Sequence, residues 1–288
     1  MPSQRQLKTR IRSVTNTRQI TKAMQMVAAS KMRRAQEATK ASHAYAEAAN
    51  EILAHLASQG ETRDHKWFAT REVKRRLIIV ISTDKGLAGA YDANVLKVYL
   101  GLLRADNEAN IKSSTVTIGR KASRFATKLK DSDIVGSYDD LPDYPDGSQF
   151  YAVINTAKDM FERKEIDAVD VVYTRFISSM SQVADTVRLF PAGFHETEVS
   201  ETVRAATFEP SPEEVLDSVA YRLISSKLFQ ALLDARASEY SMRMLAMKNA
   251  TDNAGDIIED LTLAMNKARQ ASITQELSEI SAGVEALK

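Results

Sequence analysis

Apolar residues recur every three or four positions in two long stretches, one at each end of the chain. Leu7, Ile11 and Val14 open the first stretch with a spacing typical of one face of an α-helix, and the pattern fades near Ser58. The second stretch runs from about Ser211 to the last residue. Helices at opposite ends of a chain pair only by folding back on each other, so the pattern predicts an antiparallel helix pair with an inserted middle domain.

The middle of the chain has a different pattern. Residues 77–81 form an unbroken apolar run rich in β-branched side chains, which is typical of a strand buried on both faces of a parallel sheet. Further strand patterns at 115–118, 168–174 and 183–190 alternate with helical segments. This alternation predicts a Rossmann-like α/β domain.

We therefore expect an α/β fold with long α-helices, in which an antiparallel coiled coil of the terminal helices carries an inserted Rossmann-like domain. The expected boundaries are an N-terminal coiled-coil helix at 1–60, a linker at 61–76, the α/β domain at 77–195, a connection at 196–210 and a C-terminal coiled-coil helix at 211–288.

The last helix has a clear start and an apolar end. Ser211, Pro212 and Glu214 supply a capping serine, a proline for the first helical position and an acid for the first turn. The final stretch has coiled-coil spacing at Ile273, Leu277, Ile280, Val284 and Leu287. The same seam meets polar Gln270 and Asn266 further back, so an apolar tip is expected beyond a polar segment.

Composition narrows the possible classes of protein. The 288 residues include 39 basic and 38 acidic side chains, a balance that argues against nucleic acid as a main partner. The absence of cysteine excludes disulfides, thiolate metal sites and cysteine nucleophiles. No apolar run reaches the length of a membrane span, and the N-terminus has no signal-peptide pattern. We expect the protein to work in the compartment where it is made.

The basic residues are unevenly placed. Ten Lys or Arg residues and a single acid, Glu37, lie between Arg5 and Lys40. The stretch is either a solvated helix face or a basic surface that faces an acidic partner.

The segment from Ser82 to Gly89 lies between a predicted strand and a predicted helix, where phosphate-binding loops occur in α/β folds. It matches neither the Walker A pattern nor G-x-G-x-x-G. A structural turn, in which Gly86 and Gly89 supply unusual backbone angles around Asp84 and Lys85, is therefore favoured over a nucleotide site or a docking site.

Other candidate chemistry is sparse. The four histidines are scattered without metal-ligand spacing, and the acidic residues at 139–146 fit a turn, so no bound metal is expected. His43 and His55 lie on the first helix and are expected to face solvent. The last helix is unusually rich in Asn, Gln and Thr between Asn249 and Thr274, which indicates either a solvated face or directional hydrogen bonds to a partner.

Four segments together resemble one family. They are residues 11–32 (IRSVTNTRQITKAMQMVAASKM), 82–94 (STDKGLAGAYDAN), 243–254 (RMLAMKNATDNA) and 266–280 (NKARQASITQELSEI). In this order they are similar to the signatures of the gamma subunit of F-type ATP synthase. The redox insertion of the chloroplast type is absent.

The resemblance implies a rotor shaft. The coiled coil would turn inside a hexamer of alternating alpha and beta subunits, and the α/β domain would contact the epsilon subunit and the ring of c subunits. One copy is expected per complex, on the cytoplasmic face of a bacterial inner membrane, with membrane contact only through partners. The chain would bind no cofactor, since the alpha and beta subunits would bind ATP, ADP and Mg. An independent α/β nucleotide-binding enzyme is the first alternative, and a passive coiled-coil scaffold is the second.

The resemblance also assigns roles to residues of this chain. Polar "catch" contacts with beta-subunit loops are implied for Arg243 and Gln270, and Thr274 and Glu276 match the neighbours of these positions. The catch contacts with the beta subunit also include Lys22 and Met24, which are implied at the same level on the facing helix. A foot near the c-ring and the epsilon subunit is implied for Phe208 and Glu209.

Overall fold

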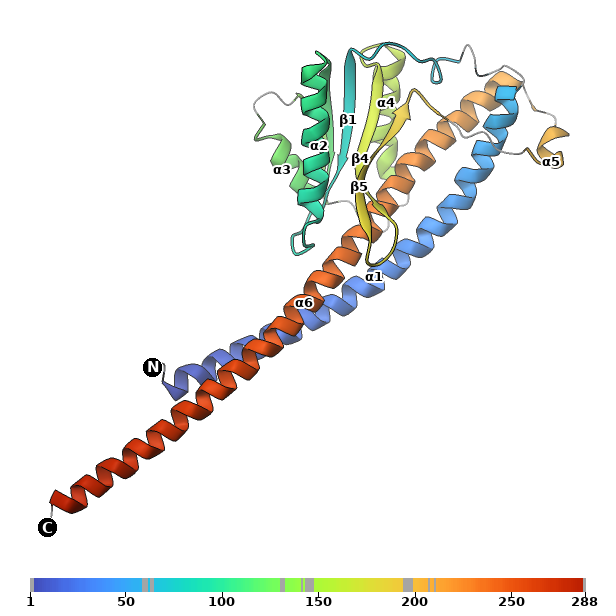
Figure 1. The fold of residues 1–288 in the computed structure, drawn as a ribbon. Helices are drawn as coiled ribbons and strands as arrows, with labels where there is room; N and C mark the ends of the chain where they lie inside the picture. Colours follow the sequence, from blue (N-terminus) through green and yellow to red (C-terminus); the bar gives the residue numbers. More distant parts are fainter. Residues whose placement is uncertain are drawn as a thin grey trace. The chain divides into compact units, whose positions relative to one another are not determined.

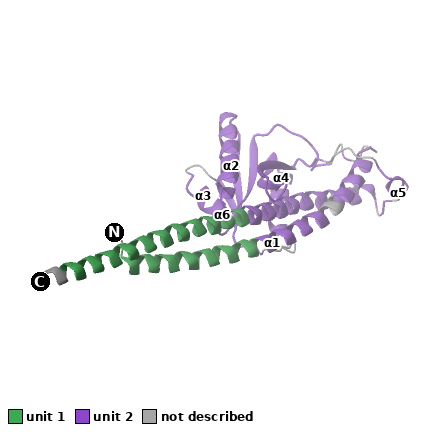
Figure 2. Cartoon of the chain, turned by 60° about the horizontal axis from the view of Figure 1, so that its bottom comes forward, with its two compact units in different colours: residues 1–28, 243–288 green, residues 29–242 purple. Residues whose placement is uncertain are grey.

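The structure is a computed structural model that describes residues 3–58, 62, 65–129, 133–140, 142, 148–193, 199–206, 208–209 and 211–286. Two long helices, α1 (Gln4–Ser58) and α6 (Pro212–Ala286), enclose an α/β segment in the chain order (Figure 1). The chain divides into two compact units (Figure 2): Met1–Ala28 with Arg243–Lys288 form unit 1, and Ala29–Met242 form unit 2.

Unit 2 is built around a five-stranded sheet with the order β3-β2-β1-β4-β5. The four strands from β3 to β4 are parallel, and β5 pairs with β4 in the antiparallel direction. The α/β class predicted from the sequence is confirmed. The elements between the long helices are β1 (Arg75–Ile81), α2 (Tyr91–Glu108), β2 (Lys112–Ile118), α3 (Arg120–Ala126), β3 (Asp133–Tyr138), α4 (Ser148–Glu162), β4 (Ala168–Phe176), β5 (Gln182–Phe190) and α5 (Glu201–Arg204).

Two features of the sheet were not expected from the sequence. The antiparallel direction of β5 follows from its short connection, because residues 177–181 suffice for a hairpin and not for a parallel crossover. Strand β3 lies at the sheet edge with alternate residues exposed, so it lacks the long apolar run that identifies β1.

Strand β1 separates two apolar layers. Leu77 and Ile79 belong to the larger core, which includes α4 and parts of both long helices. Ile78 and Val80 face the second core, formed with α2 and α3. These four side chains have no exposed surface. The strand is therefore buried on both faces, as predicted, with α2 and α4 on opposite sides of the sheet (Figure 1).

Both long helices also take part in the larger core of unit 2. From α1, Leu53 and Leu56 are fully buried there. His55 lies between them and is also buried, with its ring 5.8 Å from that of Phe208. The expectation that His55 faces solvent was wrong, because this part of α1 is covered on more than one side. His43 lies in α1, and its side chain falls outside the description.

In unit 1 the first turns of α1 run antiparallel to the later part of α6. The hydroxyls of Thr21 and Thr251 form a 2.8 Å hydrogen bond across the seam. One turn earlier in α1, the guanidinium of Arg18 lies over Gly255, 3.7 Å from where a Cβ would stand. Later residues of α6 thus meet earlier residues of α1, which confirms the antiparallel pairing. Among the described residues, no helix is long and apolar enough to cross a membrane.

Candidate functional site

The loop after β1 is held by bonds to its own chain. The backbone N–H of Thr83 donates to Asp92 on the first turn of α2 at 3.0 Å, and the Thr83 hydroxyl lies 2.8 Å from the same carboxylate and from the carbonyl of Lys85. Burial raises the pKa of Asp92, against the bonds from Thr83 that lower it. Asp92 therefore ties the loop to the start of α2.

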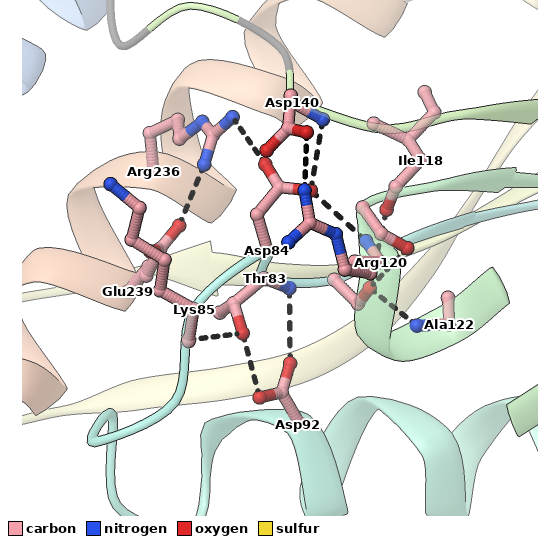
Figure 3. Close-up of polar contacts among 12 residues, drawn as sticks. Thr83, Asp84, Lys85, Asp92, Ile118, Arg120, Ala122, Asp140, Arg236 and Glu239 are labelled. Carbon is pink, nitrogen blue, oxygen red and sulfur yellow. Dashed lines mark hydrogen bonds and ion pairs between the residues drawn. The ribbon is translucent and has the colours of Figure 1, made fainter. Parts of the chain in front are cut away.

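Asp84 connects this loop to three other parts of unit 2 (Figure 3). Its carboxylate accepts bonds from the backbone N–H groups of Arg120, at 3.0 Å, and Asp140, at 3.1 Å. It also lies 3.8 Å from Arg236 of α6, whose guanidinium is 2.9 Å from Glu239. Burial alone would lower the pKa of Arg236, but Glu239 and Asp84 help to raise it, so the guanidinium remains charged.

The backbone of the loop has two residues in the left-handed region. Gly89 has a φ of +60°, in line with the expected role of a glycine. The other is Leu87, with a φ of +66°, whereas Gly86 lies outside this region. The left-handed φ that the sequence suggested for Gly86 is therefore adopted by the next residue, Leu87.

Gly119, which follows β2, was missed by the sequence analysis. Its φ is +96°, and a Cβ at this position would lie 2.3 Å from the carbonyl oxygen of Ser82. The Ser82 hydroxyl in turn accepts a 2.7 Å bond from the N–H of Ala122. A glycine directly after a strand pattern was the available signal, because the two strand ends of a parallel sheet lie side by side.

These contacts favour the structural turn over a nucleotide site. The carboxylate of Asp84 and the hydroxyls of Ser82 and Thr83 bond within the fold. In the part of the chain that the structure describes, no group of three His, Asp or Glu residues is arranged to hold a metal ion. The arrangement fixes backbone positions, including that of α6.

The proposed catch residues lie in unit 1, at two separate levels. Lys22 is exposed, and its amino group is 3.4 Å from the side-chain oxygen of Gln25. Met24 and Arg243 are half-buried. Because Thr21 meets Thr251, the level of Lys22 and Met24 lies near residues 247–251 of α6.

The second level lies further along α6. Gln270, Thr274 and Glu276 are exposed, and Gln270 is about 29 Å beyond Thr251 at the rise of an α-helix. By the same measure it is about 40 Å from Arg243. The structure thus does not bring Arg243 and Gln270 together, and each would have to meet a partner on its own.

The apolar tip has no partner within the described chain. Ile273, Leu277 and Ile280 are 49%, 61% and 64% exposed. The antiparallel register explains this, because α1 begins at Gln4 and is too short to reach so far along α6. The side chain of Val284 and all of Leu287 lie outside the described residues.

The two foot residues lie just before α6 in the sequence. Phe208 is half-buried and packs on the ring of His55. Glu209 is exposed. The contact with His55 fixes this segment to α1 and leaves the carboxylate at the surface.

Comparisons with known proteins agree along the whole chain. A family model described as ATP synthase matches residues 3–287. The ATP synthase gamma chains of Stenotrophomonas maltophilia (strain R551-3) and Xanthomonas campestris pv. campestris (strain B100) are 43% and 42% identical to this chain. Both alignments cover all of this chain and all of the relative.

Solved structures share the fold. A chain from the central stalk and c-ring structure of the Tetrahymena thermophila mitochondrial ATP synthase has a TM-score of 0.63 at 23% identity, covering 80% of this chain and 99% of that one. A chain from the Euglena gracilis mitochondrial ATP synthase (OSCP/F1/c-ring, rotational state 3) has a TM-score of 0.66 at 18% identity, covering 99% and 94%. The same architecture therefore occurs in solved structures of low sequence identity to this chain.

Proposed function

The chain belongs to the ATP synthase gamma-chain family and is a central-stalk subunit of that complex; from this premise we propose how its surfaces act as the rotor shaft. The observation that carries the proposal is the full-length match, together with a stretch of α6, residues 269–282, that is exposed throughout. An exposed helix with apolar and polar bands fits a shaft that is enclosed by other subunits.

The shaft couples rotation to the state of each catalytic site. Ion flow turns a ring of c subunits, the ring turns this chain, and the chain turns inside a hexamer of alternating alpha and beta subunits. Because unit 1 is not symmetric about its axis, each beta subunit meets a different face of it in turn. Each face favours a different conformation, and differential binding of the shaft shifts the equilibrium between the states that bind and release nucleotide.

The catch residues of unit 1 would meet beta-subunit loops at the two levels described above. Lys22, Met24 and Arg243 act nearer the sheet-bearing part of the sequence, and Gln270 acts with Thr274 and Glu276 nearer the tip. Charged and amide groups form directional bonds, so each level holds the shaft at preferred angles. Two levels along unit 1 would resist tilting as well as turning.

The apolar tip would turn within a sleeve of the hexamer. Ile273, Leu277 and Ile280 offer methyl groups without hydrogen-bonding capacity, and dispersion contacts do not depend strongly on direction. The sleeve therefore excludes water from the tip and still allows it to slide.

The foot at Phe208 and Glu209 would contact the epsilon subunit and the c-ring. One copy is present per complex, on the cytoplasmic face of a bacterial inner membrane, and the membrane is reached only through partners. The chain carries out no bond chemistry. ATP, ADP and Mg are bound by the alpha and beta subunits.

Stoichiometry and nucleotide binding test this proposal against its alternatives. The chain is co-expressed with its cognate alpha and beta subunits, and the purified complex is weighed by native mass spectrometry. A rotor gives one copy per hexamer, whereas a symmetric scaffold gives a number that matches the subunits it joins. Equilibrium dialysis of the isolated chain with radiolabelled ATP is expected to show no binding, and saturable binding would favour the independent enzyme.

A further inference from the structure

A short segment of α6 is enclosed on every side. Residues 235–241 are all buried, and seven consecutive residues cover almost two helical turns at 3.6 residues per turn. Helices at a protein surface normally leave one face in water. At this point, where unit 2 ends, α6 is therefore surrounded by other parts of the chain.

Four side chains of this segment meet polar or charged groups of other elements in unit 2. We call those surrounding groups the collar; they belong to Lys31, Asp84, Thr174, Ser179 and Gln182. Arg236 lies 3.8 Å from Asp84, and the amino group of Lys31 lies 5.5 Å from the ring centre of Tyr240.

The two serines make the direct hydrogen bonds to the collar. The Ser238 hydroxyl donates to the carbonyl of Thr174 at the end of β4 at 3.2 Å. The Ser241 hydroxyl donates to the carbonyl of Ser179 at 2.6 Å and accepts from the side chain of Gln182 at 3.1 Å. Both residues have no exposed surface, so water does not replace these bonds easily.

The contacts lie at different angles around the helix axis. At about 100° per residue, Ser238 is roughly 200° from Arg236, and Ser241 is roughly 140° from it. A turn of α6 about its own axis in either direction would lengthen some of these contacts. Restraints on opposite sides of a rod oppose rotation in both senses.

The preceding part of α6 is held in a different way. From Leu216 to Ala235 its buried contacts with the larger core are mainly apolar. Such contacts stabilise the fold strongly but depend little on direction. The collar therefore adds a resistance to rotation of α6 about its own axis, which the apolar core supplies only weakly.

We propose that the collar is a torsion lock, in which Arg236, Ser238, Tyr240 and Ser241 are positioning residues that prevent α6 from turning against the sheet. The inference rests on the proposed rotor function, since the lock matters when torque passes between the sheet domain and the helix pair. Torque applied at the sheet is transmitted to α6 through the collar contacts, before α6 turns about its own axis relative to the sheet.

The test replaces the two serines and measures stiffness. Because the natural chain has no cysteine, Glu108→Cys at the exposed end of α2 accepts a single optical probe. In a complex with a surface-fixed hexamer, stalled without ATP, the angular variance of the probe measures torsional stiffness. Ser238→Ala with Ser241→Ala removes three of the five collar contacts of α6, so we expect the variance to rise about 2.5-fold if the contacts are of similar strength.

Ser226→Ala is the matched control. Ser226 is a buried serine of the same helix, and within the described residues its hydroxyl bonds to the carbonyl of Leu223 of that helix and to no other element. The control should leave the variance unchanged and lower the melting temperature about as much as each collar variant. Equal variance in the double variant and the control would overturn the lock.

A second measurement does not depend on rotation. In the isolated chain, nitroxides at Glu108→Cys and Leu245→Cys report the width of their distance distribution by pulsed electron resonance. The double variant is expected to broaden this distribution, and the Ser226→Ala control is not. An unchanged width of the distance distribution in the double variant would reject the lock. If the wild-type complex does not rotate with ATP, the rotor function is rejected instead, and the distance measurement still decides whether the lock exists.

Discussion

At the scale of single residues, Gly119 decides whether the loop after β1 can close on the next strand. Its φ of +96° is one that other residues rarely adopt, and its missing Cβ leaves room for the backbone of Ser82. This close approach places the Ser82 hydroxyl on the N–H of Ala122 and brings Asp84 to the N–H of Arg120. The contact between Asp84 and Arg236 of α6 depends on that placement.

We predict that Gly119→Ala destabilises the chain by about 2 to 4 kcal/mol, through backbone strain and a clash with the Ser82 carbonyl. Urea denaturation followed by circular dichroism measures the change in the free energy of unfolding. Gly101→Ala is the control, because this glycine lies in α2 with open space around it. Gly101→Ala should raise the free energy of unfolding by about 0.5 to 1 kcal/mol. Equal effects of the two substitutions would show that Gly119 has no special role.

A second prediction concerns the polar residues of unit 1. Arg243→Ala or Gln270→Ala should lower the ATPase turnover of the coupled complex about fivefold, the effect of losing one hydrogen bond worth about 1 kcal/mol. Assembly should remain largely intact. Gln275→Ala is the control for Gln270, since its side chain bonds to Glu279 of the same helix at 2.9 Å. Loss of assembly, with normal activity in the complex that remains, would contradict a catch role.

Some of these residue roles could be predicted from the sequence and some could not. The left-handed angle at Gly89 follows from its residue type and its place between a strand and a helix. The pairing of Asp84 with Arg236 has no local pattern, because it depends on how α6 crosses the strand ends. The burial of His55 could not be predicted from the local sequence either, because the side chain that packs on it, Phe208, comes from a distant part of the chain.

At the scale of elements, length and apolar runs carried most of the prediction. The unbroken run at 77–81 identified a central strand, and the long helical periodicities identified α1 and α6. Strand β3 was missed because an edge strand of six residues buries little and contains Gly136. The apolar spacing after Ile273 predicted a seam, but the pattern alone does not state whether its partner lies in the same chain.

The exposed stretch of α6 at residues 269–282 supports a third prediction. Removal of residues 284–288 should be tolerated better than removal of the segment Asn266–Glu276, because the latter contains the outer polar level. Steady-state ATPase activity and ATP-driven proton pumping in membrane vesicles measure the two deletions. Each deletion is compared at an equal amount of assembled complex. An equal loss from both would indicate that the tip bears as much of the load as the polar segment.

At the scale of the whole molecule, family membership and physical argument lead to the same function. The full-length identity of 43% to a bacterial gamma chain places the chain in the central stalk of an ATP synthase. In the proposed function each unit has its own role: the helix pair of unit 1 contacts the hexamer, and the sheet domain of unit 2 transmits torque to α6 through the collar. Neither unit contains, among its described residues, a clustered set of metal-binding side chains.

Single-molecule rotation shows directly whether this chain turns as a shaft inside the hexamer. The hexamer of cognate alpha and beta subunits is fixed to a surface, a probe is attached through Glu108→Cys, and ATP is added. We expect unidirectional stepwise rotation of the probe with three main steps per turn, one for each beta subunit. A stable complex that hydrolyses ATP while the probe stays still would contradict it, since the chain would then be a static stalk.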